Sequence, residues 1–418
     1  MTVLVVGGGG REHALVWKIA QSPRVKRILC APGNAGTAVL AENFPVKGAD
    51  LDGTVALARR EKVDLVVVGP DDPLASGLVD RLQAAGIRAF GPTASAARFE
   101  SSKSFAKDFM RRHGIPTAAA ERFTDFESAS AFARGQKYPL VVKADGLALG
   151  KGVTIAEDFS AAERALSASL IGKVFGDAGS TVVIEEFLSG RECSLHALVD
   201  GKSWLLFPDA RDHKRAFDGD RGPNTGGMGT LSPSGRVDDA LRVRIEKEIL
   251  GPFVRGLHAD GIDFRGMLFP GLMLTADGPK VLEFNARFGD PETQVLLPRL
   301  KTDLVELLEA TIDGRLDSVR AEWDARAACC VVMASGGYPG EYKTGIPIRG
   351  LDECAGLVFH AGTKRDGDSV ITAGGRVLGV TALGENAPKA VRLAYDDVRR
   401  IRFDNAVWRT DIGSPDPA

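Results

Sequence analysis

The segment 280–292 carries side chains suited to a metal and phosphate site, on one predicted strand and the turn after it. Because side chains alternate along a strand, Glu283 and Asn285 should face one cavity, with Leu282 and Phe284 in the opposite layer. An acid and an amide supply hard oxygen ligands for Mg²⁺, whose shell phosphates and water complete. The spacing therefore predicts a magnesium site beside a bound phosphate.

The turn after this strand adds charged groups. Arg287 lies within reach of the same phosphates. Asp290 stands where a helix N-cap would, with Pro291 at the first helical position. An edge strand with a solvated charge cluster is the alternative, but it leaves the ordered combination of these residues unexplained.

A glycine-rich turn at Gly7–Gly10 follows the first predicted strand and invites a dinucleotide-binding interpretation. Two details oppose it: the third glycine of that motif would fall at Glu12, and the second strand ends at 29–31 without an acid for a ribose hydroxyl. We favour a phosphate monoester at this turn. A purely structural turn between strand and helix is equally consistent with the segment.

A second glycine loop spans residues 143–153 and lies between two predicted strands, which excludes an ordinary P-loop. Such a loop can fold over ATP as a lid, with Lys143 and Lys151 neutralising phosphate charge. A surface hairpin with solvated lysines is the alternative. Two lysines and three glycines within this loop favour the lid.

Two further segments suit a nucleotide and an anionic substrate. The predicted strand 182–188 resembles a hinge whose backbone could pair with adenine, and Glu192 could bind ribose hydroxyls. The basic run 212–215 precedes a glycine-rich loop at 222–229, where backbone amides could hold an anion. His213 is titratable, but we expect it to bind or orient rather than act as general base.

These motifs must be positioned by regular secondary structure. Over residues 1–120, short apolar segments typical of strands alternate with segments typical of helices. The pattern indicates a doubly wound parallel sheet whose loops line one crevice. The expected strands are 3–6, 27–30, 64–68 and 87–90, and the expected helices are 11–21, 73–85 and one starting near 93.

Three more regions follow in the α+β part of the chain. Residues 121–187 read as a small lid subdomain, with helices at 126–134 and 159–169. Residues 188–315 form a central domain, in which 276–278 is a hairpin turn before the metal strand. Residues 316–418 form a β-rich C-terminal domain.

Composition narrows the functional class. Among 418 residues, 53 basic side chains face 55 acidic ones, so no bulk charge favours nucleic acid or an anionic membrane. The five cysteines show no paired spacing, and no apolar run approaches a membrane span. We expect a cytoplasmic enzyme.

In this order, the motifs resemble the ATP-grasp superfamily and, within it, the phosphoribosylamine–glycine ligases (glycinamide ribonucleotide synthetases). The resemblance covers nearly the whole chain. The segments that carry it are Gly9–Ala14, Ala31–Gly36, Phe90–Thr93, Lys143–Leu147, Asp212–Arg215, Gly222–Gly229, Glu283–Asn285, Arg287–Glu292 and Gly336–Gly340.

The resemblance implies residue roles. Nucleotide-binding residues would be Lys103, Lys143, Gly146, Gly150, Lys151, Gly152, Glu185, Glu186, Phe187, Leu188 and Glu192. Substrate-binding residues would be Gly9, Gly10, Arg11, Glu12, His13, Gly69, Pro70, Asp71, Asp212, His213, Lys214, Asn224, Thr225, Gly226, Gly227, Met228, Arg287, Gly289, Asp290, Pro291 and Glu292. Arg287, Asp212 and Asp290 would be catalytic, and Glu283 and Asn285 would hold Mg²⁺, with Mn²⁺ as the alternative metal.

The implied reaction joins glycine to phosphoribosylamine through a glycyl phosphate made from ATP, in a monomer. Competing interpretations are another ATP-grasp ligase such as a carboxylase, a nicotinamide-dependent dehydrogenase, and a non-catalytic nucleotide-binding regulator. The chain departs from the family pattern at Asp71, 210–211, 269–270 and Ala373. Of these, 210–211 adjoins the expected substrate crevice.

Overall fold

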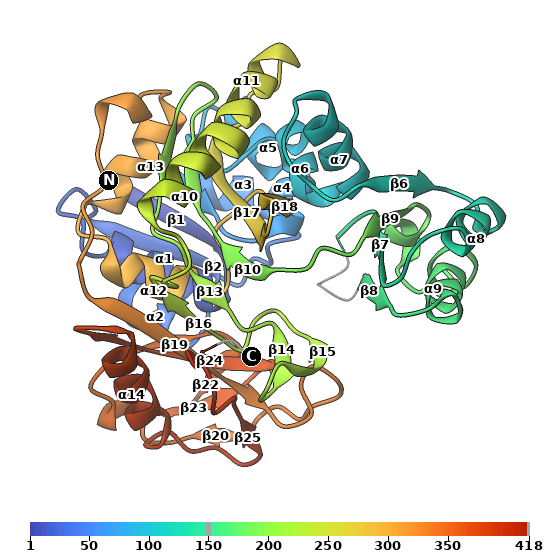
Figure 1. Cartoon of the computed structure of the whole chain (residues 1–418). Helices are drawn as coiled ribbons and strands as arrows, with labels where there is room; N and C mark the ends of the chain where they lie inside the picture. Colours follow the sequence, from blue (N-terminus) through green and yellow to red (C-terminus); the bar gives the residue numbers. More distant parts are fainter. Residues whose placement is uncertain (148–151, 416–418) are drawn as a thin grey trace.

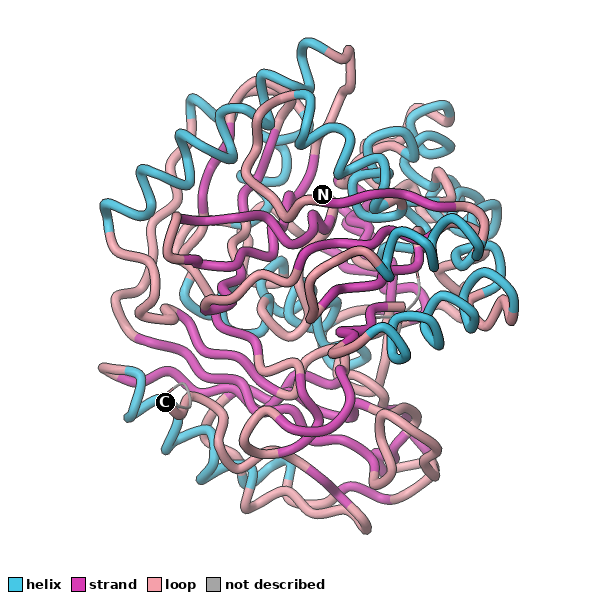
Figure 2. Tube along the Cα trace, turned by 45° about the vertical axis from the view of Figure 1, so that its right-hand side comes forward, coloured by secondary structure: helices cyan, strands magenta, loops and turns pink. Residues whose placement is uncertain are grey.

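The computed structural model describes residues 1–147 and 152–415. Figure 1 shows the segment from 120 to 186 standing to the right of the other parts, with the C-terminal sheet at the bottom. Figure 2 shows the strands running through the middle of the molecule, with helices along its outside. Regions that are far apart in the sequence therefore lie next to one another in the fold.

The N-terminal region is a five-stranded parallel sheet in the order β3-β2-β1-β4-β5, which confirms the doubly wound prediction. Near-continuous apolar runs in its central strands suit a sheet buried on both faces. The strands are β1 (Thr2–Gly7), β2 (Arg27–Pro32), β3 (Glu42–Asn43), β4 (Leu65–Val68) and β5 (Ala89–Phe90). The helices are α1 (Gly10–Ile19), α2 (Thr37–Leu40), α3 (Leu51–Arg60), α4 (Asp71–Ala75), α5 (Leu78–Ala84), α6 (Ala94–Ser101) and α7 (Lys103–Arg112).

The single helix expected over 73–85 is wrong, because α4 and α5 are separate helices. Gly77 lies between them with φ of +84°, a backbone conformation that L side chains rarely adopt. The left-handed residue ends one helix and starts the next. The interruption places Asp71 in the first turn of α4, at the carboxyl end of β4.

The lid subdomain is a four-stranded antiparallel sheet in the order β6-β9-β7-β8, with two helices packed on it. Asp125 and Asp158 cap the two helices by accepting from Ser128 and Ala161 amides. The elements are β6 (Ala120–Phe123), α8 (Phe126–Arg134), β7 (Leu140–Ala144), β8 (Val153–Ala156), α9 (Phe159–Leu166) and β9 (Val182–Glu186), with helical turns at Ser167–Ile171 and Gly176–Gly179.

The central region is built on the long hairpin of β17 (Gly266–Thr275) and β18 (Gly278–Asn285), which confirms the turn at 276–278. Its other strands are β10 (Arg191–Ser194), β11 (Ala197–Val199) and β12 (Trp204–Leu206). Its helices are α10 (Asp239–Ile245), α11 (Gly251–Ala259), α12 (Thr293–Arg299) and α13 (Leu304–Ile312), with helical turns at Glu246–Leu250 and Leu316–Ser318.

A bulge interrupts β18, so the strict side-chain alternation expected there is wrong. Gly271 pairs with Glu283 and Leu272 pairs with Val281, which leaves Leu282 as an extra residue. Leu282 consequently packs with apolar cavity-lining residues on the side of Glu283, whereas Phe284 stays in the central core as expected.

The C-terminal region shares its main sheet with the central region. Strand β16 (Gly229–Ser232) pairs with β19 (Ala327–Ser335), giving a six-stranded antiparallel sheet around β19 and β24. The remaining strands of that sheet are β13 (Arg211–Asp212), β24 (Arg376–Gly384), β21 (Leu357–His360) and β25 (Ala406–Val407). Beside it lie β14 (Arg215–Phe217), β15 (Arg221–Asn224), β20 (Pro347–Ile348), β22 (Thr363–Asp366), β23 (Ser369–Thr372), α14 (Ala387–Val398) and a helical turn at Leu351–Glu353.

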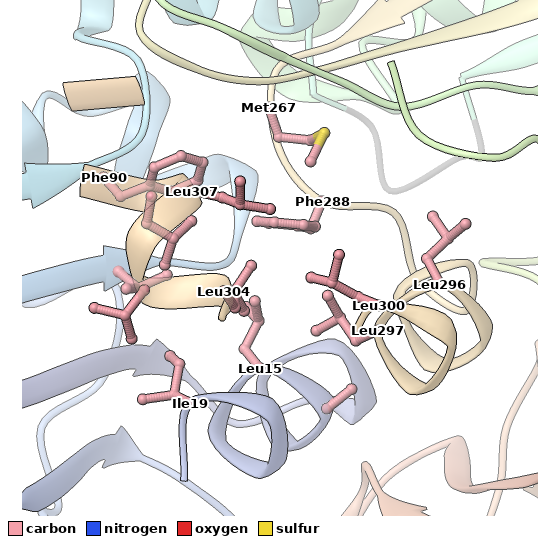
Figure 3. Packing of buried hydrophobic residues seen from close by; sticks show 14 of the residues in the cluster. Leu15, Ile19, Phe90, Met267, Phe288, Leu296, Leu297, Leu300, Leu304 and Leu307 are labelled. Carbon is pink, nitrogen blue, oxygen red and sulfur yellow. The ribbon is translucent and has the colours of Figure 1, made fainter. Parts of the chain in front are cut away.

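The largest apolar core joins the regions. Figure 3 shows Leu15 of α1 beside Leu297 of α12 and Leu300, which follows that helix, with Leu304 of α13 and Phe288 close by. All five side chains are buried. Burial of apolar surface on this scale fixes α12 against the N-terminal domain, and with it the turn at 286–292 that precedes α12.

Candidate active site

A cavity of about 1040 Å³ lies where the four regions meet. Arg11 reaches it from the N-terminal domain, Lys143 from the lid, Glu283 from the central hairpin and Arg376 from the C-terminal sheet. A cavity this large can take a nucleotide and a second substrate together. Carboxylates and cations are interleaved along its wall.

Most of the expected site residues line this cavity. Those that do are Arg11, Asp71, Lys103, Lys143, Gly146, Gly152, Glu185, Glu186, Phe187, Leu188, Glu192, Asp212, His213, Lys214, Asn224, Thr225, Gly226, Glu283, Asn285, Arg287, Asp290 and Glu292. Those outside its lining are Gly9, Gly10, Glu12, His13, Gly69, Pro70, Gly227, Met228, Gly289 and Pro291. Gly150 and Lys151 lie outside the described residues.

Two lysines share one carboxylate at the nucleotide end of the cavity. The Nζ atoms of Lys143 and Lys107 each lie 3.0 Å from Glu185 Oε2, and the Glu185 side chain is only 2 % exposed. Lys143 Nζ also donates to Leu282 O at 3.1 Å. Burial lowers the pKa of Lys107 to about 8, against the opposing attraction of Glu185. Two cations fixed this way present positive charge to a polyphosphate.

An apolar patch lies near these lysines. Leu282 packs against the buried side chains of Ala118, Leu188 and Met273, and all four line the cavity. This surface suits the face of a purine base, and it begins where strand β9 ends. The bulge in β18 is what places Leu282 in the patch.

Hydrogen bonds tie the base of the glycine loop to the start of α7. Lys103 Nζ donates to Gly146 O at 2.9 Å, and the Ser104 amide donates to Asp145 Oδ1 at 3.1 Å. Ser102 caps α7 by accepting from the Phe105 amide. Lys103 therefore lies between α7 and the loop expected to cover a nucleotide.

Glu283 and Asn285 offer a donor set suited to a hard divalent cation. Asn285 Nδ2 donates to Phe269 O at 3.3 Å, and Oδ1 accepts from Arg287 NH2 at 3.3 Å, which leaves Oδ1 one further acceptor position for a ligand. Burial raises the pKa of Glu283, but attraction to Lys214, Lys143 and Lys103 outweighs burial and lowers it overall. An ionised carboxylate and an amide oxygen facing one cavity fit Mg²⁺ with phosphate and water ligands.

Arg287 is held by partners on several sides. Its NH2 group lies 2.9 Å from Glu100 Oε1 and 3.3 Å from Asn285 Oδ1, and its NH1 group donates to Phe288 O at 3.2 Å. The buried Nε atom has no partner among the described residues. The guanidinium is thus fixed next to Glu283 and Asn285, and its Nε–H group remains available to donate to a ligand.

Asp212, which is partly buried, and Glu292, which is buried, form a pair of carboxyl groups in the cavity wall. Burial is the main cause that raises the pKa of each, and Glu292 adds repulsion at Asp212. Ser194 Oγ donates to Glu292 Oε1 at 3.1 Å, while Asp212 Oδ1 has no partner among the described residues. Carboxyl groups arranged in this way can bind an amine or accept a proton more readily than an ordinary carboxylate.

Asp290 does not cap a helix, so that prediction is wrong. Helix α12 begins at Thr293, and the Asp290 carboxylate instead pairs with Arg376 at 3.0 Å and accepts from Gln294 Nε2 at 2.7 Å. Burial raises the pKa of Asp290, but Arg376 and Arg11 attract its charge more strongly and lower it overall. Asp290 therefore stays ionised at the junction with the C-terminal sheet.

At the N-terminal glycine turn, one backbone amide is already engaged within the chain. The Gly9 amide donates to Glu12 Oε2 at 2.6 Å, so a carboxylate already occupies the amide that an anion would need. Arg11 pairs with Glu12 at 2.6 Å and also donates to Phe288 O. The turn reaches the cavity through Arg11 alone.

His13 and His213 both have structural partners. His13 Nδ1 accepts from the His360 amide at 2.8 Å, which joins α1 to the C-terminal sheet. His213 Nδ1 lies 3.2 Å from Gly229 O, and its Nε2 accepts from the Gly413 amide at 3.2 Å. Burial lowers the pKa of His213 to about 4. The neutral ring has both nitrogens engaged, consistent with orientation rather than general-base work.

Sequence reasoning missed three charged residues of the site. Glu100 and Lys107 lie on α6 and α7 among the apolar side chains of the central core, and Arg376 is the first residue of β24. A charged residue on an otherwise apolar helix face is a signal that could have found the first two. No local pattern marks Arg376, because its role depends on how the C-terminal sheet packs.

Family models match three consecutive parts of the chain. They are phosphoribosylglycinamide synthetase models: the N domain at residues 1–100, the ATP-grasp (A) domain at 101–293 and the C domain at 328–415. No helix in the described residues is long and apolar enough to cross a membrane.

Curated relatives match along the whole chain. The phosphoribosylamine–glycine ligase of Allochromatium vinosum is 54% identical over 419 residues, covering 99% of this chain and 98% of the relative. The enzyme of that name from Escherichia coli O6:H1 is 51% identical, with 99% and 98% covered.

Solved structures show the same arrangement. The phosphoribosylamine–glycine ligase of Thermotoga maritima has a TM-score of 0.88 at 34% identity, covering 99% of this chain and 100% of that one. A biotin carboxylase from Campylobacter jejuni, solved in a complex with β,γ-ATP, has a TM-score of 0.72 at 16% identity, covering 97% and 92%. At that identity the second likeness concerns the fold alone.

Proposed function

Since the chain belongs to the phosphoribosylglycinamide synthetase family, we propose that it joins glycine to 5-phospho-D-ribosylamine, with ATP converted to ADP and phosphate. The product is glycinamide ribonucleotide, and the reaction is the second step of de novo purine (IMP) biosynthesis. The observation that carries the proposal is a single cavity. It is lined by the candidate metal ligands Glu283 and Asn285, by Lys103 and Lys143, and by the carboxyl groups of Asp212 and Glu292.

ATP binding is assigned to the lid side of the cavity. The base lies on the apolar patch of Leu188, Met273 and Leu282, and the phosphates run toward Lys103 and Lys143. Glu283 and Asn285 hold the divalent cation, for which their oxygens favour Mg²⁺ over softer metals. When bound, the cation neutralises charge on the transferred phosphoryl group.

Phosphoryl transfer to glycine is assigned to the space beside Arg287. A carboxylate is a poor acyl donor, so the glycine carboxylate takes the γ-phosphoryl group and releases ADP. The Arg287 guanidinium, held by Glu100, stabilises charge on the equatorial oxygens. The glycine ammonium group lies against Glu292, a buried carboxyl group next to this position.

Amide formation is assigned to Asp212. The amine of phosphoribosylamine attacks the acyl carbon, the carbon–oxygen bond to phosphate breaks, and the amine proton passes to the Asp212 carboxylate. A raised pKa makes an ionised carboxylate a stronger base. Asp290 and Arg376 fix the turn that carries this chemistry, and Lys214, paired with Glu192 at 3.1 Å, offers charge to the substrate phosphate.

The remaining expectations fit this assignment. The four regions that build the cavity belong to one chain, so a monomer suffices for activity. The five cysteines are free, and burial raises the pKa of each thiol, which suits a reducing cytoplasm.

ADP formation tests the proposal when each substrate is omitted in turn. With ATP and Mg²⁺ present, we expect ADP release that requires both glycine and phosphoribosylamine. Release that depends on bicarbonate instead would indicate a carboxylase, and release with neither substrate would exclude a ligase. A repeat with Mn²⁺ in place of Mg²⁺ compares the two metals.

A further inference from the structure

The β14–β15 hairpin projects from the strands that carry the expected substrate residues. Asp212 and Lys214 precede it, Asn224 is its last residue, and Thr225 and Gly226 follow it, all lining the cavity. The hairpin pairs with itself and with no other strand in the described part of the chain. In Figure 1 it lies next to the C-terminal sheet. Its position must therefore be set by contacts other than sheet pairing.

Arg409, about 190 residues further along the chain, supplies such contacts. Its side chain is 2 % exposed, and NH1 donates to Asp220 Oδ1 at 2.6 Å and to Arg215 O at 3.2 Å. Nε and NH2 bond both oxygens of Asp411 at 2.7 Å. The guanidinium thus joins strand β14 and the turn of the hairpin to the segment 408–414.

Neighbouring residues extend the junction on either side of Arg409. The Thr410 amide donates to Asp218 Oδ1 at 2.8 Å, and the Gly219 amide donates to Asp411 Oδ2 at 2.8 Å. His213, next to Asp212, accepts from the Gly413 amide. The hairpin tip and the residue beside Asp212 are therefore both tied to one short segment.

That segment is anchored on its other side without the Arg409 side chain. Ile412 is buried in the C-terminal core, and the Tyr395 hydroxyl accepts from the Ile412 amide at 2.9 Å and donates to Arg409 O at 2.7 Å. Loss of the Arg409 guanidinium would consequently remove the bonds to Asp220 and Arg215 and loosen the hairpin, while the segment stays in place. An Arg409 variant can therefore change the position of the hairpin without unfolding the C-terminal core.

We propose that Arg409 is a positioning residue for the substrate side of the cavity, acting through the hairpin on Asp212, Lys214 and Asn224. The assignment of these three residues to substrate rests on the function proposed above. Arg409 itself touches neither substrate nor metal. Its effect should therefore fall on glycine and phosphoribosylamine and spare ATP, whose assigned residues lie on the lid and the central hairpin.

The test compares Arg409→Met and Arg409→Lys with Arg399→Ala in the full-length protein. Arg399 pairs with Asp396 on exposed α14 and is the matched control. We expect Arg409→Met to raise KM for glycine or phosphoribosylamine by about tenfold or more, with KM for ATP within about twofold. Arg409→Lys should recover part of the loss, and Arg399→Ala should match the wild type.

Hydrogen exchange gives a readout that does not depend on activity. Amides of 215–226 should exchange faster in Arg409→Met than in the wild type, with the C-terminal core unchanged. Asp220→Asn keeps an acceptor oxygen but removes the charge at the other end of the ion pair, so it should act in the same direction, even if Arg409→Met folds poorly. Failure of the wild type to require glycine and phosphoribosylamine would overturn the proposed function and leave the exchange test valid.

Two results would overturn the positioning role. One is unchanged KM values together with wild-type exchange in the hairpin. The other is a loss of kcat that follows only the fraction of folded protein, which would make Arg409 a stabilising residue.

Discussion

The Arg287 guanidinium lies 2.9 Å from the Glu100 carboxylate, whose second oxygen accepts from the Ala286 amide at 2.7 Å. One carboxylate on α6 thus fixes both the backbone and the side chain at the start of the 286–292 turn. Burial raises the pKa of Glu100, while Arg287 opposes that effect. Arg287 owes its orientation to a residue from the N-terminal helices.

Glu100→Gln tests this relationship. The amide keeps an acceptor for Ala286 but removes the charge that holds Arg287, so kcat/KM should fall about tenfold, mainly through kcat. Steady-state kinetics at saturating ATP measure the change. Glu309→Gln is the control, because Glu309 also pairs with arginine yet lies outside the cavity lining. Equal rates for Glu100→Gln and the wild type would show that the charge of Glu100 is not needed to orient Arg287 for the reaction.

Glu283→Gln tests the metal assignment. Removing the charge weakens binding of a hard divalent cation, so the Mg²⁺ concentration for half-maximal rate should rise about tenfold or more. The fold should persist, because Gln has nearly the same volume. Rates across a Mg²⁺ titration, with circular dichroism as a check on folding, measure this. Near-normal turnover at low Mg²⁺ would contradict the assignment.

Asp212→Asn separates the two chemical steps. The variant should still form glycyl phosphate but lose amide formation by about 100-fold or more, because no base takes the amine proton. Glycine-dependent scrambling of ¹⁸O between the bridging and non-bridging β,γ positions of ATP reports the first step, and product formation reports the second. Loss of both steps together would assign Asp212 to glycine binding instead.

Gly227→Ala tests how tightly the crevice is packed. Gly227 has φ of +107°, and an added Cβ would lie 2.4 Å from Pro291 Cδ and 2.7 Å from Asp212 Oδ1. Gly235 has φ of +73° and open space around its Cβ position, so Gly235→Ala carries a backbone cost without the clash. Each change should cost about 1 kcal/mol of backbone strain, but Gly227→Ala alone should lose activity. Urea unfolding and kcat/KM for both variants decide this, and equal activities would contradict it.

Acid should destabilise the fold through its buried histidines. Burial lowers the pKa of His13 and His196 to about 3 and of His213 and His360 to about 4. The unfolded chain binds protons near pH 6.5, so their contribution is complete above that pH and is lost as pH falls toward 4 to 3. Each should cost about 2 kcal/mol of stability at pH 5 relative to pH 7.5.

Urea unfolding at pH 7.5 and pH 5 measures this effect. His13→Gln should flatten the pH dependence, since the variant lacks one of the titrating groups. His258→Gln, at an exposed position, should leave it unchanged. A His13 variant with the full wild-type pH dependence would contradict the assignment.

Local patterns predicted much of the site. The parallel sheet followed from apolar strands such as β1 and β4, and the position of Glu283 and Asn285 in one cavity followed from their spacing on the strand. These features depend on residues close in sequence, where strand period and ligand chemistry apply directly. The order of the motifs was enough to indicate the family.

Features that depend on contacts between separate strands or regions could not be predicted in this way. The bulge at Leu282 depends on how β18 pairs with β17. Asp290 was read as a helix cap because Arg376, its partner, lies 86 residues further along the chain. Local sequence carries no information about a partner of that kind.

The sheet shared by β16 and β19 limits how the protein can be recombined with its relatives. A chimera cut at the linker near residue 320 would pair β16 of one parent with β19 of the other along the register from Gly229 to Ser232. Mismatched side chains between β16 and β19 would disturb β16, which pairs with the strand β13 that carries Asp212. Functional chimeras should therefore transplant residues 208–232 together with the C-terminal region, so that two distant stretches of the gene are inherited as one unit.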